Sequence, residues 1–242
     1  MDKPINDIKF GIITPTYQKL DGTTHDELKR ALESVKEQTY ENYKVYLIGD
    51  DYEDNEELIK LSKIIDPEKI YVENLPEAVE RKKYKGRQLW VCAGTNASNI
   101  AIEYALKDEC DFICFLDHDD YYKCNHLKVL FETIKKFNTH FVTTKCGTYP
   151  KIDNPKTYNL YRPLHSRIFK ISTCIDLNHY DFRFRNMVED EKNTFPGDAD
   201  LWVRVNKEMT KNDEFGYFVN IETCVHKNEG TTWKKPEVVK KL

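Results

Sequence analysis

Three carboxylates lie within four residues at Asp117-His118-Asp119-Asp120, directly after an apolar run at residues 112–116. Five apolar residues without alternation are typical of a strand that is buried on both faces of a sheet. In open α/β sheets, ligands bind outside the carboxyl ends of such strands. Neighbouring carboxylates repel one another and are best tolerated beside a cation, and their oxygens suit Mg²⁺ or Mn²⁺. The pattern predicts a divalent ion that bridges to a phosphate ligand; the alternative is a solvated acidic turn.

The first 145 residues alternate between strand and helix patterns. Apolar runs predict strands at residues 10–13, 43–48, 70–72, 112–116 and 140–144. Apolar residues at helical spacing predict helices at residues 24–35, 56–65, 97–106 and 125–137. Such alternation indicates an α/β fold with a mostly parallel sheet and helices on both of its faces.

Local signals refine this outline. Thr24-x-x-Glu27 has the form of a capping box, and Asn125 suits the N-cap position of a helix. Residues 77–88 are polar and basic, which predicts a loop. Its run Arg81-Lys82-Lys83, like Lys234-Lys235, is typical of a solvated face, although the first run could also hold a diphosphate or an anionic acceptor.

The pattern changes after residue 146. Residues 147–165 are predicted to form a loop, 166–171 a strand, 176–196 an irregular segment, 198–209 a helix and 215–225 a long strand. No internal repeat or linker is evident, so we expect one domain over residues 1–242. Its first 145 residues would form one half, residues 146–230 an extension, and residues 231–242 a tail.

Composition restricts the class of protein. The chain has 242 residues, and its 37 basic and 41 acidic side chains give a net charge of −4, which provides no case for nucleic-acid binding. Its seven cysteines are odd in number and include no C-x-x-C pair, which argues against a disulfide framework and a zinc site. The amino-terminal residues lack a signal-peptide pattern, and no apolar run approaches the roughly 20 residues that span a bilayer. We expect a soluble, cytoplasmic protein in a reducing compartment, and peripheral membrane binding is compatible with this pattern.

Five motifs resemble the GT-A glycosyltransferases, especially glycosyltransferase family 2, and they extend over residues 8–230. The motifs are F-G-I-I-T-P-T-Y at 10–17, L-I-G-D-D at 47–51, G-T-N-A-S-N-I-A at 94–101, F-L-D-H-D-D at 115–120 and G-D-A-D-L-W-V-R at 197–204. Three positions depart from the family pattern. Tyr52 follows Asp51 where the family has Gly, Ser98 replaces an Arg, and Gly197 replaces a Glu.

The resemblance implies a nucleotide-sugar donor, with a UDP-sugar as the default, and Mn²⁺ or Mg²⁺ as the cofactor. It implies that the acceptor is a hydroxyl of a glycan, a lipid-linked sugar or a protein. The implied nucleotide-binding residues are Pro15, Thr16, Tyr17, Asp51, Asn99 and Asp117. The implied metal ligands are Asp119, Asp117 and His226, whereas a structural role for His226 is the alternative. We interpret His118 as a loop residue that binds no metal, and Asp120 as either a support for the ligands or a solvated side chain.

The resemblance also implies an inverting reaction, in which Asp198 removes the proton from the acceptor hydroxyl. A base of this kind works best with a raised pKa, which burial can provide. Asp200 is the rival base, and helix capping is the alternative role of Asp198. Trp202 and Trp233 could stack on a sugar face, although a core position is the alternative for Trp202.

Two other functions stay open. A sugar nucleotidyltransferase has a related core but would carry a Gly-rich, basic loop after its first strand. Here the segment that starts at Thr14 contains no glycine before Gly22. An inactive GT-A-like module that binds a glycan or a protein partner is compatible with the three departures from the family pattern. Serine or cysteine hydrolase motifs, a P-loop and G-x-G-x-x-G are absent from the sequence.

Overall fold

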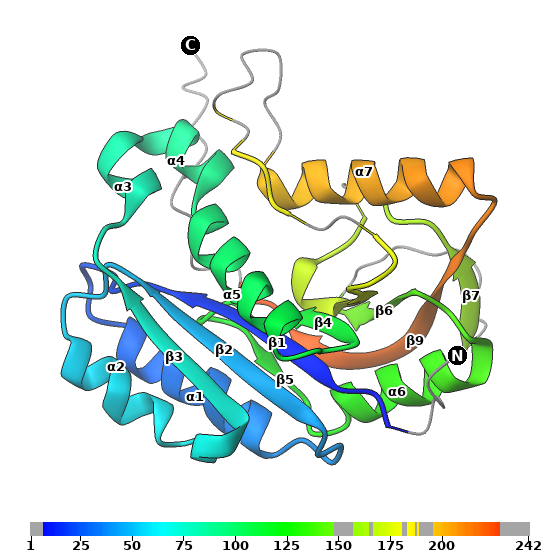
Figure 1. Cartoon of the computed structure of the whole chain (residues 1–242), viewed down its shortest axis with the longest axis horizontal. Helices are drawn as coiled ribbons and strands as arrows, with labels where there is room; N and C mark the ends of the chain where they lie inside the picture. Colours follow the sequence, from blue (N-terminus) through cyan, green and yellow to red (C-terminus); the bar gives the residue numbers. More distant parts are fainter. Residues whose placement is uncertain are drawn as a thin grey trace, which may run out of the picture.

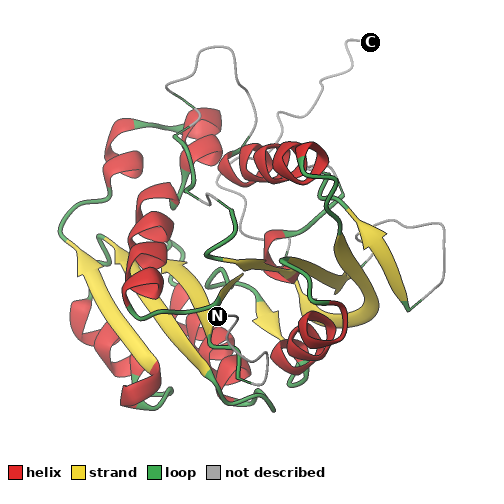
Figure 2. Ribbon diagram, turned by 45° about the vertical axis from the view of Figure 1, so that its right-hand side comes forward, coloured by secondary structure: helices red, strands yellow, loops and turns green. Residues whose placement is uncertain are grey.

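A computed structural model describes residues 7–147, 157–164, 167–180, 183–186, 188 and 196–227. Within these ranges the strands form one nine-stranded sheet in the order β3-β2-β1-β4-β8-β6-β9-β5, with β7 paired to β9. Helices cover both faces of this sheet (Figures 1 and 2). The predicted α/β class and the mostly parallel sheet are confirmed.

The amino-terminal half contains the parallel strands. Strand β1 (Phe10–Thr16) lies between β2 (Tyr43–Asp50) and β4 (Phe112–Phe115), and β3 (Ile70–Leu75) lies beyond β2. All of these neighbours run parallel, so their carboxyl ends meet at one edge of the sheet. This edge is where the aspartates after β2 and β4 come together.

Alternate residues of the central strands enter two separate cores. Phe10 and Ile12 pack on one face with helices α1 (Thr24–Lys36), α2 (Asn55–Ser62) and α6 (His126–Phe137). Ile13 packs on the other face with α5 (Thr95–Lys107) and α7 (Gly197–Lys211). Because successive side chains of a strand point to opposite faces, an unbroken apolar run fits a sheet that is covered twice.

The carboxyl-terminal half extends the same sheet in a mixed arrangement. Strand β8 (Thr173–Asp176) runs antiparallel between β4 and β6 (Phe141–Cys146). Strand β9 (Gly216–Val225) is parallel to β6, and it also pairs with two short antiparallel strands, β5 (Tyr121–Tyr122) and β7 (Tyr158–Tyr161). This half places α7 and the end of β9 beside the carboxyl ends of the parallel strands.

The predicted loop at residues 77–88 is wrong, because it contains the helices α3 (Val79–Lys83) and α4 (Gly86–Cys92). Neither helix is long enough to show a periodic apolar face. Tertiary contacts hold the first one: Arg81 bonds to the carbonyl oxygen of Asp50, and a carboxylate oxygen of Glu80 accepts the backbone N–H of Asn96 at 2.7 Å. Contacts of this kind override weak local preference.

The predicted strand at residues 166–171 is also wrong. Within it, Lys170 begins a short 3₁₀ helix (Lys170–Ser172), and the strand β8 starts only at Thr173. The Thr173 hydroxyl donates to the carbonyl oxygen of Lys170 at 2.7 Å, which closes the turn before the strand begins. Strand β7 lies inside the predicted loop at residues 147–165, of which residues 148–156 are outside the described ranges.

The capping signals at two helix starts are not used as predicted. Thr23 occupies the N-cap of α1, and Thr24 instead accepts the backbone N–H of Lys19 at 2.8 Å. Glu27 turns away from the helix end and pairs with lysines, as described below. Asn125 does stand at the N-cap of α6, but its side chain makes no capping hydrogen bond. Among the helices that the structure describes, none is long and apolar enough to cross a bilayer.

Candidate active site

A cleft of about 460 Å³ opens at the carboxyl ends of β1, β2 and β4. Both halves of the chain contribute to its walls. The predicted site residues that line it are Pro15, Thr16, Tyr17, Asp117, Asp119, Asp198 and His226. Tertiary structure therefore gathers seven predicted residues that are up to 211 positions apart in sequence, from Pro15 to His226, around one space.

Two predicted nucleotide-binding residues do not line this cleft. Asp51 has a left-handed backbone with φ of 54°, and its side chain is 44% exposed and lies 3.5 Å from Lys82 Nζ. Asn99 exchanges two hydrogen bonds with the backbone of Phe184, at 2.9 and 2.8 Å. The positive φ turns Asp51 away from the cleft, and the amide of Asn99 is committed to fixing the chain around Phe184.

Asp50, the residue before Asp51, faces the cleft together with Tyr17 and Arg81. The Arg81 guanidinium lies 3.6 Å from the centre of the Tyr17 ring and 3.1 Å from Asp50 Oδ2. Asp50 Oδ1 is buried and has no hydrogen-bond partner among the described residues. Burial raises the pKa of Asp50 to about 6, although Arg81 acts in the opposite direction. This end of the cleft thus has an aromatic surface, a cation and an open carboxylate oxygen.

Two carboxylates of the acidic motif have separate partners from the second half of the chain. Asp117 Oδ1 accepts a hydrogen bond of 2.6 Å from Lys170 Nζ. Asp120, which is only 1% exposed, bonds to His226 Nδ1 at 3.0 Å and to the backbone N–H of Lys227 at 2.9 Å. Asp120 is therefore a buried connection between the loop after β4 and the end of β9, and its predicted solvated alternative is wrong.

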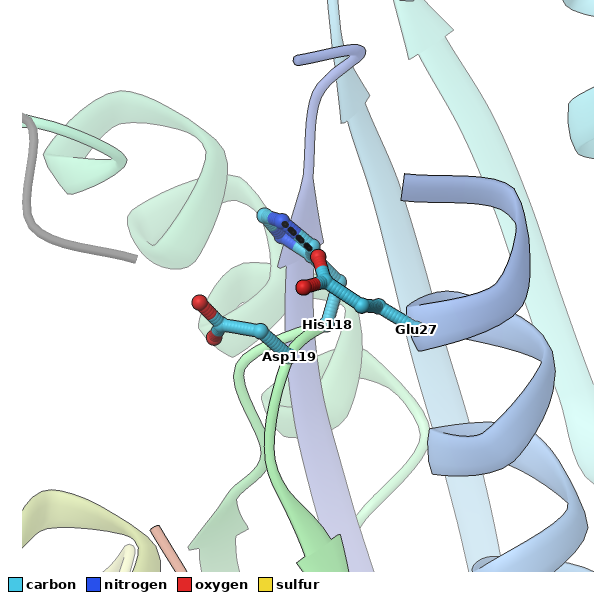
Figure 3. Close-up of side chains that lie close together, drawn as sticks. All are labelled: Glu27, His118 and Asp119. Carbon is cyan, nitrogen blue, oxygen red and sulfur yellow. Dashed lines mark ion pairs between the residues drawn. The ribbon is translucent and has the colours of Figure 1, made fainter. Parts of the chain in front are cut away.

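Glu27, His118 and Asp119 form a group with one ligand atom from each residue, and these atoms lie within 4.8 Å of one another. Figure 3 shows Glu27 reaching from α1 toward the loop that carries the other two. His118 Nε2 is buried, lies 3.9 Å from Glu27 Oε2 and makes no hydrogen bond within the described chain. Burial lowers the pKa of His118, which favours the uncharged imidazole that can bind a metal.

This group also contacts two lysines. Lys19 Nζ lies 2.6 Å from Glu27 Oε2 and 3.2 Å from Asp119 Oδ2, while Lys227 Nζ lies 3.2 Å from Glu27 Oε1. The ammonium groups offset the negative charge of the two carboxylates. A divalent ion would have to displace or accompany Lys19.

The group contains only one of the three predicted metal ligands, Asp119. The other two, Asp117 and His226, are paired with Lys170 and Asp120 instead. His118, which we predicted to bind no metal, is buried and belongs to the group. The loop bends after Leu116, so strand alternation no longer decides the direction of the side chains beyond it.

Asp198 stands in the first turn of α7 and lines both the cleft and a side pocket of about 70 Å³. Burial raises its pKa, and the charge of Lys170 partly offsets this shift. Its Oδ1 accepts the N–H of Ala199 at 2.8 Å, but the structure records no N-cap bond for α7. The rival Asp200 is committed to an ion pair of 2.8 Å with Arg204 Nε.

The tryptophan that lines the cleft is not one of the two that were predicted to stack on a sugar. Trp202 is fully buried, and its ring meets Phe115 and Phe141 edge-on at 6.2 Å in both cases, so it is a core residue. Trp90, which the sequence analysis did not single out, lines both the cleft and the side pocket. Trp233 lies outside the described residues.

Sequence reasoning therefore missed Asp50, Glu27, Lys19, Lys170 and Trp90. Arg81 is different, because the basic run at residues 81–83 had suggested that it could bind an anion. Glu27 was hidden by its match to a capping box, and Asp50 by its identical neighbour. Nothing in the local pattern distinguishes Lys170 from the many solvated lysines of this chain.

Comparisons with known proteins show the family and the fold of this chain. An uncharacterized glycosyltransferase of Acanthamoeba polyphaga mimivirus, R139, is 32% identical over 242 residues that cover 93% of this chain and 96% of that protein. The chain belongs to the glycosyltransferases. A second uncharacterized glycosyltransferase, from Rickettsia bellii, is 30% identical over 155 residues, which are 64% of this chain and 19% of that protein. No protein-family model matches the chain.

Solved structures of S. aureus TarS share the fold. The complex of TarS residues 1–349 with UDP matches 90% of this glycosyltransferase with a TM-score of 0.62 and 14% identity. The complex with UDP-GlcNAc matches 93% with a TM-score of 0.59 and 15% identity. In both cases this chain spans 60% of the TarS fragment. The expected GT-A glycosyltransferase fold is confirmed, while membership of family 2 stays a prediction.

Proposed function

We propose that this glycosyltransferase transfers a sugar from a uridine diphosphate donor to an acceptor hydroxyl in one displacement that inverts the anomeric carbon. The observation that carries the proposal is the position of Asp198. Its half-buried carboxylate lines the same cleft as the Tyr17 and Asp50 end, and the acidic loop also lines this cleft. A nucleotide, a diphosphate and an acceptor could therefore lie along one continuous space.

Uracil fits the base end of the cleft better than cytosine does. Its ring N–H is a donor that can satisfy the open Oδ1 of Asp50, and its carbonyl oxygens can accept from Arg81. Cytosine presents an acceptor at the same ring nitrogen and would face a carboxylate unfavourably. The ring of Tyr17 offers a surface on which a base can pack. The TarS complexes hold UDP and UDP-GlcNAc, so UDP-GlcNAc is the first donor to test.

We propose that Mn²⁺ or Mg²⁺ is bound at Asp119 with Glu27 and His118. The orphaned Nε2 of His118 supports this set, because a buried nitrogen without a partner is costly unless something binds it. A divalent ion supplies positive charge for the departing diphosphate. Lys19 and Lys227 contact the same group and can add to that charge.

The reaction that we propose moves one proton and one bond. The acceptor oxygen attacks the anomeric carbon, the bond from that carbon to the diphosphate oxygen breaks, and UDP leaves with the electron pair. The proton of the acceptor hydroxyl passes to Asp198. Burial supports this role, since a carboxylate with a raised pKa is the stronger base.

We also propose a division of labour within a single domain. Residues up to 145 would bind the nucleotide, because they supply Tyr17, Asp50 and the acidic loop. Residues 146–230 would face the acceptor, because they supply Asp198 on α7. The proposed tail at 231–242 lies outside the described residues.

The substitution Asp198→Asn tests the proposed reaction. It should preserve UDP binding and lower the release of UDP from a UDP-sugar by roughly 100-fold or more, because the base can no longer accept a proton. Asp200→Asn is the matched control on the same helix and should keep most activity. Near-normal turnover of Asp198→Asn would contradict the assignment of the base.

Nucleotide binding is tested separately by thermal shift with UDP, CDP, GDP and ADP, each with and without Mn²⁺. We expect stabilisation by UDP that is enhanced by the metal. Stabilisation by CDP instead would contradict the reading of Asp50 and Arg81.

A further inference from the structure

Lys170 brings a positive charge from the second half of the chain into the centre of the cleft. It begins the short 3₁₀ helix before β8 and lines both the main cleft and the side pocket beside Asp198. Its Nζ donates to Asp117 Oδ1 at 2.6 Å, and its side chain is only 19% exposed. The family resemblance assigns no role to this position.

The backbone around Lys170 is held rigidly. The hydroxyl of Thr173 donates to the Lys170 carbonyl, and the hydroxyl of Ser172 donates to the carbonyl of Phe169 at 2.8 Å. The Ser172 hydroxyl also lies 3.0 Å from that of Thr143 on β6, and all three hydroxyl-bearing residues are fully buried. This backbone fixes the start of the Lys170 side chain, and the hydrogen bond to Asp117 fixes its ammonium end.

The surroundings of Lys170 favour its charged form. Burial acts against an ammonium, but the carboxylates of Asp117, Asp198 and Asp120 raise the pKa of Lys170 above its ordinary value. A permanent positive charge therefore lies between the loop after β4 and the first turn of α7. The other cations of the cleft have different partners: Arg81 pairs with Asp50, while Lys19 and Lys227 pair with Glu27.

The groups that act on Asp198 come from three elements. Lys170, on the 3₁₀ helix, favours the ionised form, and so does the Ala199 N–H on α7 itself. Asp117, in the loop after β4, acts in the opposite direction by repulsion. Among the described residues, Lys170 is the cation that acts on Asp198, and it pairs with Asp117 at the same time.

We propose that Lys170 is a positioning residue of the transfer reaction, which holds Asp117 toward the nucleotide and keeps a positive charge beside the base Asp198. This inference rests on the proposed function and adds a residue to it. It explains how Asp117 and Asp198, two carboxylates with different tasks, can line the same cleft. One ammonium offsets the charge of the first and supports the ionised state of the second.

The test compares Lys170→Met and Lys170→Arg with the wild-type protein. The measurement is kcat for UDP release from a UDP-sugar between pH 5 and 9. In Lys170→Met the acid limb of the profile should move to higher pH by at least about one unit, because Asp198 then needs a higher pH to ionise. On the falling part of that limb, a one-unit shift lowers kcat by about tenfold at a given pH. Lys170→Arg should restore most of the wild-type profile.

Lys44→Met is the matched control. Lys44 Nζ bonds to Asp108 Oδ2 at the same 2.6 Å and is 23% exposed, but it does not line the cleft. Loss of this pair should leave both the acid limb and kcat unchanged. If Lys170→Met does not fold, Lys170→Gln removes the charge while keeping a hydrogen-bond donor for Asp117. Its test is the same shift in the acid limb of the kcat profile.

The outcomes separate the two proposals. Wild-type protein that releases no UDP from any UDP-sugar would contradict the proposed function, and with it this inference. Active wild-type protein with an unchanged acid limb in the charge-neutral variant would contradict the role of Lys170 alone. An equal shift in Lys44→Met would show that the effect is not specific to the cleft.

Discussion

Consecutive aspartates stand at the ends of both β2 and β4, but their side chains point in different directions at the two sites. After β2, Asp50 faces the cleft and Asp51 points to solvent beside Lys82. After β4, Asp117, Asp119 and Asp120 all line the cleft, and each has a different basic partner: Lys170, Lys19 and His226. A position at the end of a strand therefore does not determine whether a carboxylate lines the cleft.

The backbone and the neighbouring elements explain the difference. Asp51 adopts a positive φ, which turns its side chain out of line with that of Asp50. The loop after β4 is instead surrounded by α1, the 3₁₀ helix and the end of β9. Arg30 of α1 and Lys170 of the 3₁₀ helix bring basic side chains to the loop, and the end of β9 brings the backbone N–H of Lys227. Asp51 also has a cationic partner, Lys82, but that pair lies at the surface, with the two side chains 44% and 54% exposed.

The largest effect is expected at Asp119. Asp119→Ala should abolish the Mn²⁺-dependent part of UDP binding, a loss of roughly 100-fold or more, because it removes the carboxylate shared by the proposed metal and Lys19. Calorimetric titration of UDP with and without Mn²⁺ measures it, and circular dichroism checks that the fold survives. Unchanged metal-dependent binding would sink the metal assignment.

A second prediction concerns stability at Asp120. Asp120→Asn should lower the free energy of unfolding by about 1–3 kcal/mol, because the buried carboxylate holds both His226 and the Lys227 N–H. Denaturant titration is the measurement.

The matched control for Asp120 is Asp176→Asn. Asp176 also binds a histidine, His140 at 2.8 Å, and a backbone N–H, that of Asn178, but the Asp176 side chain is 17% exposed, against 1% for Asp120. The control should cost less than about 1 kcal/mol. Equal losses would mean that burial of the Asp120 pair has no special weight.

The third prediction uses the raised pKa of Asp50. Binding of uridine, which has no phosphate to titrate, should weaken as the pH falls from 7 to 5, because Asp50 takes up a proton near its pKa of about 6. Asp50→Asn should bind uridine roughly tenfold more weakly at pH 7 and show no such pH dependence. Fluorescence or calorimetric titration at each pH measures both. A wild-type affinity that is flat over this range would exclude Asp50 as the acceptor of the base N–H.

The smallest effect is expected at Asp51. Asp51→Asn should change uridine affinity by less than about twofold, because the side chain is exposed and paired with Lys82 at the surface. The same titration as for Asp50 measures it. A loss as large as that of Asp50→Asn would restore the original sequence prediction and reverse the contrast between the two aspartates.

The amino-terminal half was predictable because its signals are local. Apolar runs that are buried on both faces and helices with one apolar stripe have periods that do not depend on distant residues. Strands were predicted at residues 10–13, 43–48, 70–72 and 112–116, and β1 to β4 lie at residues 10–16, 43–50, 70–75 and 112–115. The second half was less readable, since its short strands β5, β7 and β8 are stabilised by pairing with distant partners such as β9.

The sequence by itself determined the parallel α/β core, the acidic loop at the end of β4 and the presence of Asp198 at the start of a helix. These features follow from apolar periodicity and from residue types that stay adjacent in the chain. Only the tertiary structure decided which of two neighbouring aspartates enters the cleft, that Glu27 joins His118 and Asp119, and that Lys170 stands between Asp117 and Asp198. Each of these features depends on the direction of the backbone or on charged residues that are far apart in the sequence. A local sequence pattern specifies neither the backbone direction nor such long-range pairs.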